Sequence, residues 1–210
     1  MNAKELTEIY SQISPDINDR KAEFSKSYGR TALFSAELVF CLCTPQTNAH
    51  RAWNAAQDIM KKKLYQDRDL VAASLYKHGV RFYNNKASYI YDAMQKSDKI
   101  YRLIHRWFKD DCPEFVVRNW LIENIKGYGF KEASHFLRNV GHANDLSILD
   151  RHILRCLADY KVIDAVPKTL NSIVYQDIEC RMMMFSNRIG IDLTDLDFVF
   201  WYRQNGEIFK

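Results

Sequence analysis

The sequence has little glycine or proline, the two residues that most often interrupt regular structure. Its 210 residues include seven glycines and four prolines. No Asn-Gly or Asp-Gly pair stands between alternating apolar runs, the pattern of a short β-hairpin. These absences argue against a β architecture, so we expect an all-α fold.

Long apolar runs are also missing. No stretch approaches the roughly 20 apolar residues that a membrane-spanning helix needs, and residues 1–10 form a mixed polar segment without a signal-like apolar block. We therefore expect no membrane association and a cytoplasmic location, close to the nucleoid DNA.

The five cysteines form no framework. They stand at 41, 43, 112, 156 and 180, an odd number that gives neither a disulfide framework nor a pair of closely spaced ligand clusters for zinc or iron–sulfur. We expect buried free thiols and neither a metal nor another cofactor. The formal net charge of +4 is modest for a nucleic-acid-binding domain but permits an anionic partner.

Apolar spacing predicts a succession of helices. Phe34, Leu38, Cys41 and Leu42 mark a helix that ends at Thr44-Pro45, and Thr44 or Thr47 is expected to cap the next one. Residues 1–28 predict one or two helices, with a helix start at Ser14-Pro15-Asp16. Further helices are predicted over 68–79, 97–110, 114–126, 130–141, 168–187 and 195–204. Another is predicted to start within 80–86 and to reach 94, and one more to start at 150.

A tight turn, Gly127-Tyr128-Gly129, joins two of these helices into a helix-hairpin-helix unit. We expect Gly127 and Gly129 to need a positive φ or a close approach of their backbone to other atoms. Amide groups at the following helix N-terminus would then point outward and bind a phosphate. A plain connection between helices is the alternative interpretation.

Lys131 and Asp150 are the candidate reactive groups. Lys131 stands in the first turn of a helix, where a cation opposes the positive end of the helix dipole. An amine placed there is a candidate nucleophile, although it is also compatible with a solvated surface lysine. Asp150 is also placed to cap the helix that follows it, a role that does not exclude a chemical one.

Two segments resemble the base-excision DNA glycosylase superfamily: Ile125-Lys126-Gly127-Tyr128-Gly129-Phe130-Lys131-Glu132-Ala133 and Leu149-Asp150-Arg151-His152-Ile153. Within it, Thr44–Ala49, Val80–Ala87 and Gly206–Lys210 resemble the type 2, archaeal-like 8-oxoguanine DNA glycosylase/AP lyases. The resemblance covers residues 31–210.

The resemblance implies one glycosylase unit over 1–210 with two compact helical subdomains and an active-site cleft between them. Residues 31–165 would form a helical barrel with the hairpin at 114–141, and 1–30 plus 166–210 a packing subdomain. The implied partner is double-stranded DNA containing oxidised guanine, and the protein is expected to be a monomer.

The implied reaction is excision of 8-oxoguanine followed by strand cleavage. Loss of the base leaves positive charge on the deoxyribose, which Asp150 would stabilise, while Lys131 would capture C1′ as a Schiff base and allow β-elimination. A related glycosylase for another damaged or mispaired base, and a non-catalytic helix-hairpin-helix protein, are the alternatives.

Further roles are carried by the resemblance alone. Gln46 would enter the gap left by the flipped base, Phe82 would act as a wedge at the lesion, and Arg81 and His152 would contact phosphates. Trp201 would stack on the base, and the terminal carboxylate of Lys210 would accept from its Watson–Crick edge. The alternatives are a first-turn glutamine, a core phenylalanine, a surface arginine, structural His and Trp side chains and a frayed tail.

Overall fold

The computed structural model describes residues 3–209, and within this range the regular structure is helical, which confirms the all-α prediction. The α-helices are α1 (Lys4–Tyr28), α2 (Thr31–Cys43), α3 (Ala49–Lys61), α4 (Arg68–Lys77), α5 (Tyr83–Met94), α6 (Ser97–Lys109), α7 (Glu114–Asn124), α8 (Phe130–Asn139), α9 (Arg151–Asp159), α10 (Ser172–Ile189) and α11 (Leu193–Asn205). A single turn of 3-10 helix at Leu64–Gln66 joins α3 to α4.

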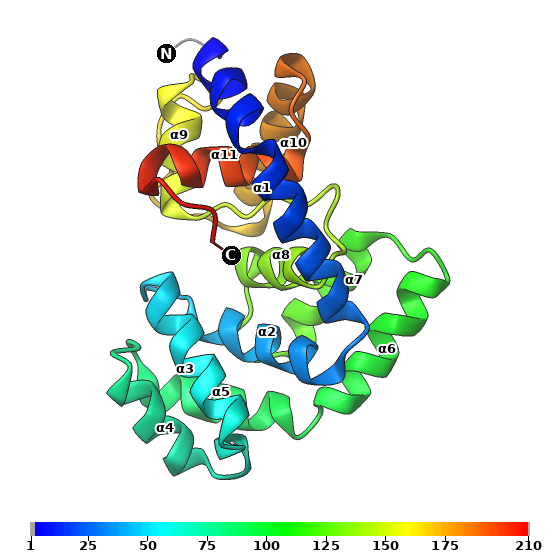
Figure 1. Ribbon diagram of the computed structural model, residues 1–210, viewed down its shortest axis with the longest axis vertical. Coiled ribbons are helices and arrows are strands. Elements are labelled where there is room, and N and C mark those ends of the chain that lie inside the picture. Colours follow the sequence, from blue (N-terminus) through cyan, green and yellow to red (C-terminus); the bar gives the residue numbers. More distant parts are fainter. Residues whose placement is uncertain (1–2, 210) are drawn as a thin grey trace.

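The helices surround two hydrophobic cores. The first core contains buried residues from Phe34 to Leu146, and α2 to α8 contribute to it. The second contains residues of α1 together with those from Leu149 to Phe200, on α9 to α11 and the segments between them. In Figure 1, α8 lies between the two groups of helices and α1 runs along both. The predicted arrangement of two compact helical bodies matches this division into cores.

The division between the cores falls earlier than the residue 165 we expected. Leu149, Ile153, Leu157 and Ile163 all pack in the second core, so the buried face of α9 belongs to that core, where α9 packs with α11. The amphipathic pattern of α9 predicts a buried face, but it does not say which of two cores receives that face.

The predicted helix start at Ser14-Pro15-Asp16 is wrong, because α1 continues through Pro15. A proline inside a helix removes one hydrogen bond and costs about 3 kcal/mol. Leu6, Ile13, Ile17 and Phe24 are all buried along one face of α1. Fully burying such side chains contributes about 1.5–3 kcal/mol each, which offsets the cost of the proline.

Helix α2 is buried on every side, since all residues from Phe34 to Cys43 are buried. This is the pattern of a helix at the centre of a bundle.

The cap that we expected for α3, Thr44 or Thr47, is wrong: the cap is Asn48, whose side chain accepts from the N–H of Arg51. Thr44 and Thr47 instead hold the candidate site together, as described below.

All five cysteines are free, but only Cys41, Cys43 and Cys156 are buried, while Cys112 is partly exposed and Cys180 exposed. The expectation of burial was therefore wrong for the last two.

Within residues 3–209 no helix has the length and apolar character needed to cross a bilayer.

The turn between α7 and α8 depends on Gly127. Its φ is +97°, a region that side chains disfavour, and an added Cβ would stand 2.5 Å from Tyr89 Cδ2 and 3.2 Å from Leu42 Cδ2. Gly129 has an extended backbone with φ −108° and ψ −171°. Its Cβ would meet the Glu132 Oε2 atom at 3.2 Å. Gly127 thus meets both expectations, and Gly129 only that of a close neighbour.

We predict that Gly127→Ala lowers the free energy of unfolding more than Gly190→Ala. Gly190 has a similar left-handed φ of +71° but open space around an added Cβ, so it isolates the backbone cost of about 1–2 kcal/mol. Overpacking against Tyr89 should add about 1–3 kcal/mol for Gly127→Ala. Denaturant titration of both variants measures the difference, and equal losses would refute the importance of the Tyr89 contact.

Candidate active site

A cleft with a volume of about 1000 Å³ contains most of the predicted site residues. Its lining comes from the α2–α3 turn, α8, the start of α9, the segment 166–170, α11 and the chain after it. The predicted residues that line it are Gln46, Arg81, Lys131, Asp150, His152 and Trp201. Phe82, Gly127 and Gly129 are not among its lining residues, and Lys210 lies outside the described residues.

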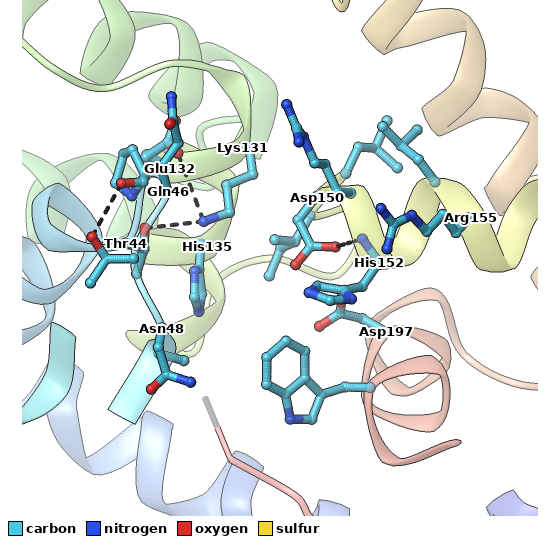
Figure 2. Close-up of a pocket in the computed structure, with 18 of the residues that line it drawn as sticks. Thr44, Gln46, Asn48, Lys131, Glu132, His135, Asp150, His152, Arg155 and Asp197 are labelled. Carbon is cyan, nitrogen blue, oxygen red and sulfur yellow. Dashed lines mark hydrogen bonds and ion pairs between the residues drawn. The ribbon is translucent and has the colours of Figure 1, made fainter. Parts of the chain in front are cut away.

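Lys131 projects into this cleft from the first turn of α8 (Figure 2). Its Nζ donates to the Thr44 hydroxyl at 3.0 Å and lies 3.7 Å from Glu132 Oε1, with the lysine side chain 20% exposed. The Thr44 hydroxyl donates its own proton to the Cys41 carbonyl at 2.9 Å, which turns its lone pairs toward the amine. The Lys131 amine is therefore fixed by its contacts with Thr44 and Glu132, and Lys131 is not a solvated surface lysine.

Asp150 faces the cleft from the N-terminus of α9. Its Oδ1 accepts from the N–H groups of His152 and Ile153, both at 2.8 Å, which confirms the predicted capping role. Figure 2 shows its other carboxylate oxygen directed toward the side of the cleft that carries Lys131. One carboxylate is thus arranged both to cap α9 and to present negative charge to the cleft.

The phosphate-binding amides expected at the hairpin are partly occupied. The N–H of Gly129 donates to Glu132 Oε2 at 3.2 Å. A carboxylate at this point complements the N-terminal end of the α8 dipole. A phosphate bound at this N-terminus would have to use other amides or displace Glu132.

Lys86 is a buried lysine behind the α2–α3 turn that sequence analysis did not single out. Its side chain is 4% exposed, and its Nζ donates to the Cys43 carbonyl at 2.8 Å, the Pro45 carbonyl at 2.7 Å and the Thr47 hydroxyl at 3.1 Å. No carboxylate of the described residues forms an ion pair with it. Burial lowers the pKa of Lys86 to about 8, and its three bonds shape the turn that carries Thr44.

Gln46 and Phe82 share an unusual backbone. Both have left-handed φ values, 53° and 56°, a strained conformation for residues other than glycine that often occurs at functional sites. Their loops are joined through Thr47, whose hydroxyl accepts from the N–H of Arg81 at 3.2 Å. Phe82 is 52% exposed, and the Arg81 guanidinium lies 5.4 Å from its ring centroid. Phe82 is therefore not a core residue.

Trp201 and His152 meet at the α9–α11 side of the cleft. Their ring centroids are 5.8 Å apart with the rings nearly perpendicular. Trp201 Nε1 and His152 Nδ1 are buried and have no hydrogen-bond partner among the described residues. Polar atoms of this kind, placed at the wall of a cleft, are available to a bound ligand.

The chain after α11 returns across the cleft to α3. Glu207 Oε1 lies 2.6 Å from His50 Nε2, and the Phe209 ring packs 4.1 Å from the His50 ring, centroid to centroid. Ile208 packs against the second core and Phe209 against the first. The tail is therefore fixed at the cleft up to the residue before Lys210.

A buried ion pair between Arg138 of α8 and Asp197 of α11 forms the wall of the cleft where the cores meet. Arg138 also lies 4.6 Å from the Phe198 ring centroid. Sequence analysis missed this pair because charged residues on helices are mostly exposed.

Comparisons with known proteins find relatives over nearly the whole chain. The family Ogg-HhH, described as 8-oxoguanine DNA glycosylase, matches residues 17–191. An 8-oxoguanine DNA glycosylase/AP lyase of Fusobacterium nucleatum is 37% identical, with 98% of this chain and 96% of that protein covered. The enzyme of the same name from Methanocaldococcus jannaschii is 34% identical over the full length of both chains.

Solved structures extend the agreement to the fold. The M. jannaschii enzyme in complex with a 15mer DNA containing 8-oxoguanine has a TM-score of 0.89 at 33% identity and covers 99% of both chains. The 8-oxoguanine DNA glycosylase of Thermotoga maritima has a TM-score of 0.88 at 30% identity and covers 99% of this chain and 98% of its own.

We predict that Lys86 makes stability depend on alkaline pH. Its pKa is about 8 in the folded protein against an ordinary 10.5, so between these values the unfolded chain binds more protons. The free energy of unfolding therefore rises with pH between 8 and 10.5, by at most about 1.4 kcal/mol per pH unit. The stabilising contribution of neutral Lys86 is complete above pH 10.5 and is lost as the pH falls to 8.

Denaturant titrations from pH 7.5 to 10 measure this dependence. The wild type should gain stability relative to Lys86→Met as the pH rises. Lys61→Met, which removes an exposed lysine, is the matched control and should run parallel to the wild type. A parallel curve for Lys86→Met would contradict the prediction.

Proposed function

Because the chain belongs to the Ogg-HhH family of 8-oxoguanine DNA glycosylases, we propose that it excises 8-oxoguanine from double-stranded DNA and then cleaves the strand as an AP lyase. One observation carries the proposal: Lys131 and Asp150 line a single cleft. They enter it from α8 and from the start of α9, whose buried faces belong to different cores.

The chemistry assigns different tasks to the two groups. Departure of the base leaves positive charge on the sugar, and the Asp150 carboxylate stabilises that charge. The neutral amine of Lys131 forms a bond to C1′, and opening of the sugar ring gives a Schiff base. The Schiff base acidifies the C2′ protons, and loss of one of them expels the 3′ phosphate by β-elimination.

The base would be recognised on the side of the cleft formed by α11 and the chain after it. Trp201 would stack on the extruded base, as aromatic side chains do in enzymes that flip bases. The carboxylate of Lys210 would accept from the N1–H and N2–H₂ groups of the guanine edge. Support for this assignment comes from the described tail residues, which His50 fixes next to the cleft.

Contacts with the duplex would come from the rim of the cleft. Phe82 and Gln46 would fill the space around the flipped nucleotide, and Arg81 and His152 would contact phosphates. Gly127 and Gly129 would bring the hairpin backbone close to the DNA strand. We propose that the protein acts as a monomer, since one chain supplies both Lys131 and Asp150.

A glycosylase for another damaged or mispaired base is the second candidate, because it would use the same amine and acid. A panel of duplexes carrying different lesions distinguishes it from the proposed function. A non-catalytic DNA-binding module is disfavoured, since such a module has no use for an amine and a carboxylate in one cleft.

We predict that Lys131→Gln abolishes formation of a covalent adduct. Borohydride reduces a Schiff base to a stable amine, so mixing the protein with 8-oxoguanine duplex and borohydride should give a protein–DNA band in a denaturing gel. The glutamine side chain keeps the length and polarity of the lysine but has no nucleophilic amine.

The matched control is Lys126→Gln. Lys126 lies in the same hairpin, above the ring of Tyr89, so its replacement removes an equal charge from the hairpin while leaving Lys131 intact. This variant should still be trapped. Undiminished trapping in Lys131→Gln would remove Lys131 from the mechanism.

We predict that Asp150→Asn slows excision without unfolding the protein. Asparagine caps helices about as well as aspartate, so stability should change by less than about 0.5 kcal/mol. Losing the charge at the sugar should slow single-turnover excision by about 10²–10³-fold, as for other electrostatic stabilisers. Excision rates and melting temperatures test both parts, and near-normal excision would leave Asp150 with the capping role alone.

A further inference from the structure

The segment before Asp150 has no regular structure, and α10 holds it in place. Residues 143–150 follow α8 without forming a helix. The hydroxyl of Tyr175 donates to the Ser147 carbonyl at 2.7 Å and accepts from the N–H of Leu149 at 3.2 Å. Glu179 Oε1 accepts from the N–H of Ser147 at 2.8 Å. Three backbone groups of this segment are thus bonded to two side chains of one helix.

These two side chains stand on the same face of α10, because residues four apart in a helix lie one above the other. Both are buried, Tyr175 at 2% and Glu179 at 8% exposure. Arg118 of α7 holds Glu179 in a two-pronged ion pair, with distances of 2.6 Å and 2.9 Å. Because its carboxylate is fixed from α7, Glu179 provides a rigid acceptor for the Ser147 amide.

The same cluster reaches the residue before Lys131. The Phe130 ring packs on the Tyr175 ring with centroids 5.1 Å apart, and the Arg118 guanidinium lies 5.0 Å from the Phe130 centroid. Phe130 directly precedes Lys131, just as Leu149 directly precedes Asp150. Tyr175 therefore contacts the chain next to both proposed reactive residues, its ring on one side and its hydroxyl on the other.

We propose that Tyr175 is a positioning residue whose hydroxyl fixes the chain before Asp150 and so sets where that carboxylate lies relative to Lys131. This inference rests on the proposed function. Catalytic geometry is sensitive to small displacements, and a misplacement of about 1 Å can lower a rate by about 10²-fold. Removing the hydroxyl leaves the Leu149 amide and the Ser147 carbonyl without their bonds to Tyr175, so the segment must shift to find others.

The test is Tyr175→Phe, which keeps the ring against Phe130 and deletes only the hydroxyl. Single-turnover excision of 8-oxoguanine should slow by about 10- to 100-fold, while duplex affinity stays within about threefold, because no DNA contact is lost. Tyr160→Phe is the matched control: its hydroxyl donates to Glu5 at 2.8 Å in the same second core. That variant should excise at the wild-type rate.

A double variant separates positioning from general loosening. If Tyr175 acts through Asp150, Tyr175→Phe should add little to the loss already caused by Asp150→Asn, because residues that act as a unit are not additive. Losses that multiply would overturn the proposal, as would a Tyr175→Phe rate equal to that of the wild type. Rates are compared at a temperature well below the melting point of every variant.

The outcomes also separate this inference from the proposed function. Normal excision by Asp150→Asn would remove the acid from the reaction, and the positioning role of Tyr175 with it. Slow excision by Asp150→Asn together with normal excision by Tyr175→Phe would overturn only the inference about Tyr175.

Discussion

Two buried arginine–carboxylate pairs link the two cores, and one of them lines the cleft. Arg118 of α7 pairs with Glu179 of α10, and Arg138 of α8 pairs with Asp197 of α11. Each arginine lies on a helix of the first core and each carboxylate on a helix of the second. Burying a charge is costly unless it is paired with good geometry, and a broken pair leaves an uncompensated charge. The two pairs therefore disfavour sliding of one core against the other, which apolar contacts alone would resist less specifically.

Helix α8 is the element through which this constraint reaches the site. Ala133, Phe136 and Leu137 pack it into the first core, while Arg138 extends from it to the second core and packs over Phe198. Lys131 stands at its N-terminal end, so the amine is fixed relative to both cores. The acid comes from the other side, at the start of α9, where bonds from α10 determine the path of the chain.

The sequence predicted the parts of the molecule that depend on local interactions. The hairpin, the place of Lys131 in the first turn of α8 and the cap at Asp150 follow from glycine, dipole and capping rules over a few residues. The same local rules wrongly predicted a helix start at Pro15, because burial along the whole of α1 outweighs the cost of a proline inside the helix. The roles of Lys86, Arg138 and Tyr175 could not be predicted from local sequence. Each depends on a distant partner: Pro45 for Lys86, Asp197 for Arg138 and Ser147 for Tyr175. Only folding brings these residues together, and a single sequence does not encode such contacts in any local spacing.

The two roles of Asp150 explain why its neighbourhood is held so firmly. A capping carboxylate needs one oxygen at the amides of its own helix, and Oδ1 serves both the His152 and the Ile153 amide. The proposed catalytic role needs the second oxygen at the sugar, so the carboxylate cannot rotate to suit the substrate without giving up the cap. The position of that second oxygen is then determined by the backbone of Asp150 alone. A chain whose catalytic charge cannot adjust by side-chain rotation must fix that backbone, and the bonds from Tyr175 and Glu179 to the preceding residues meet this requirement.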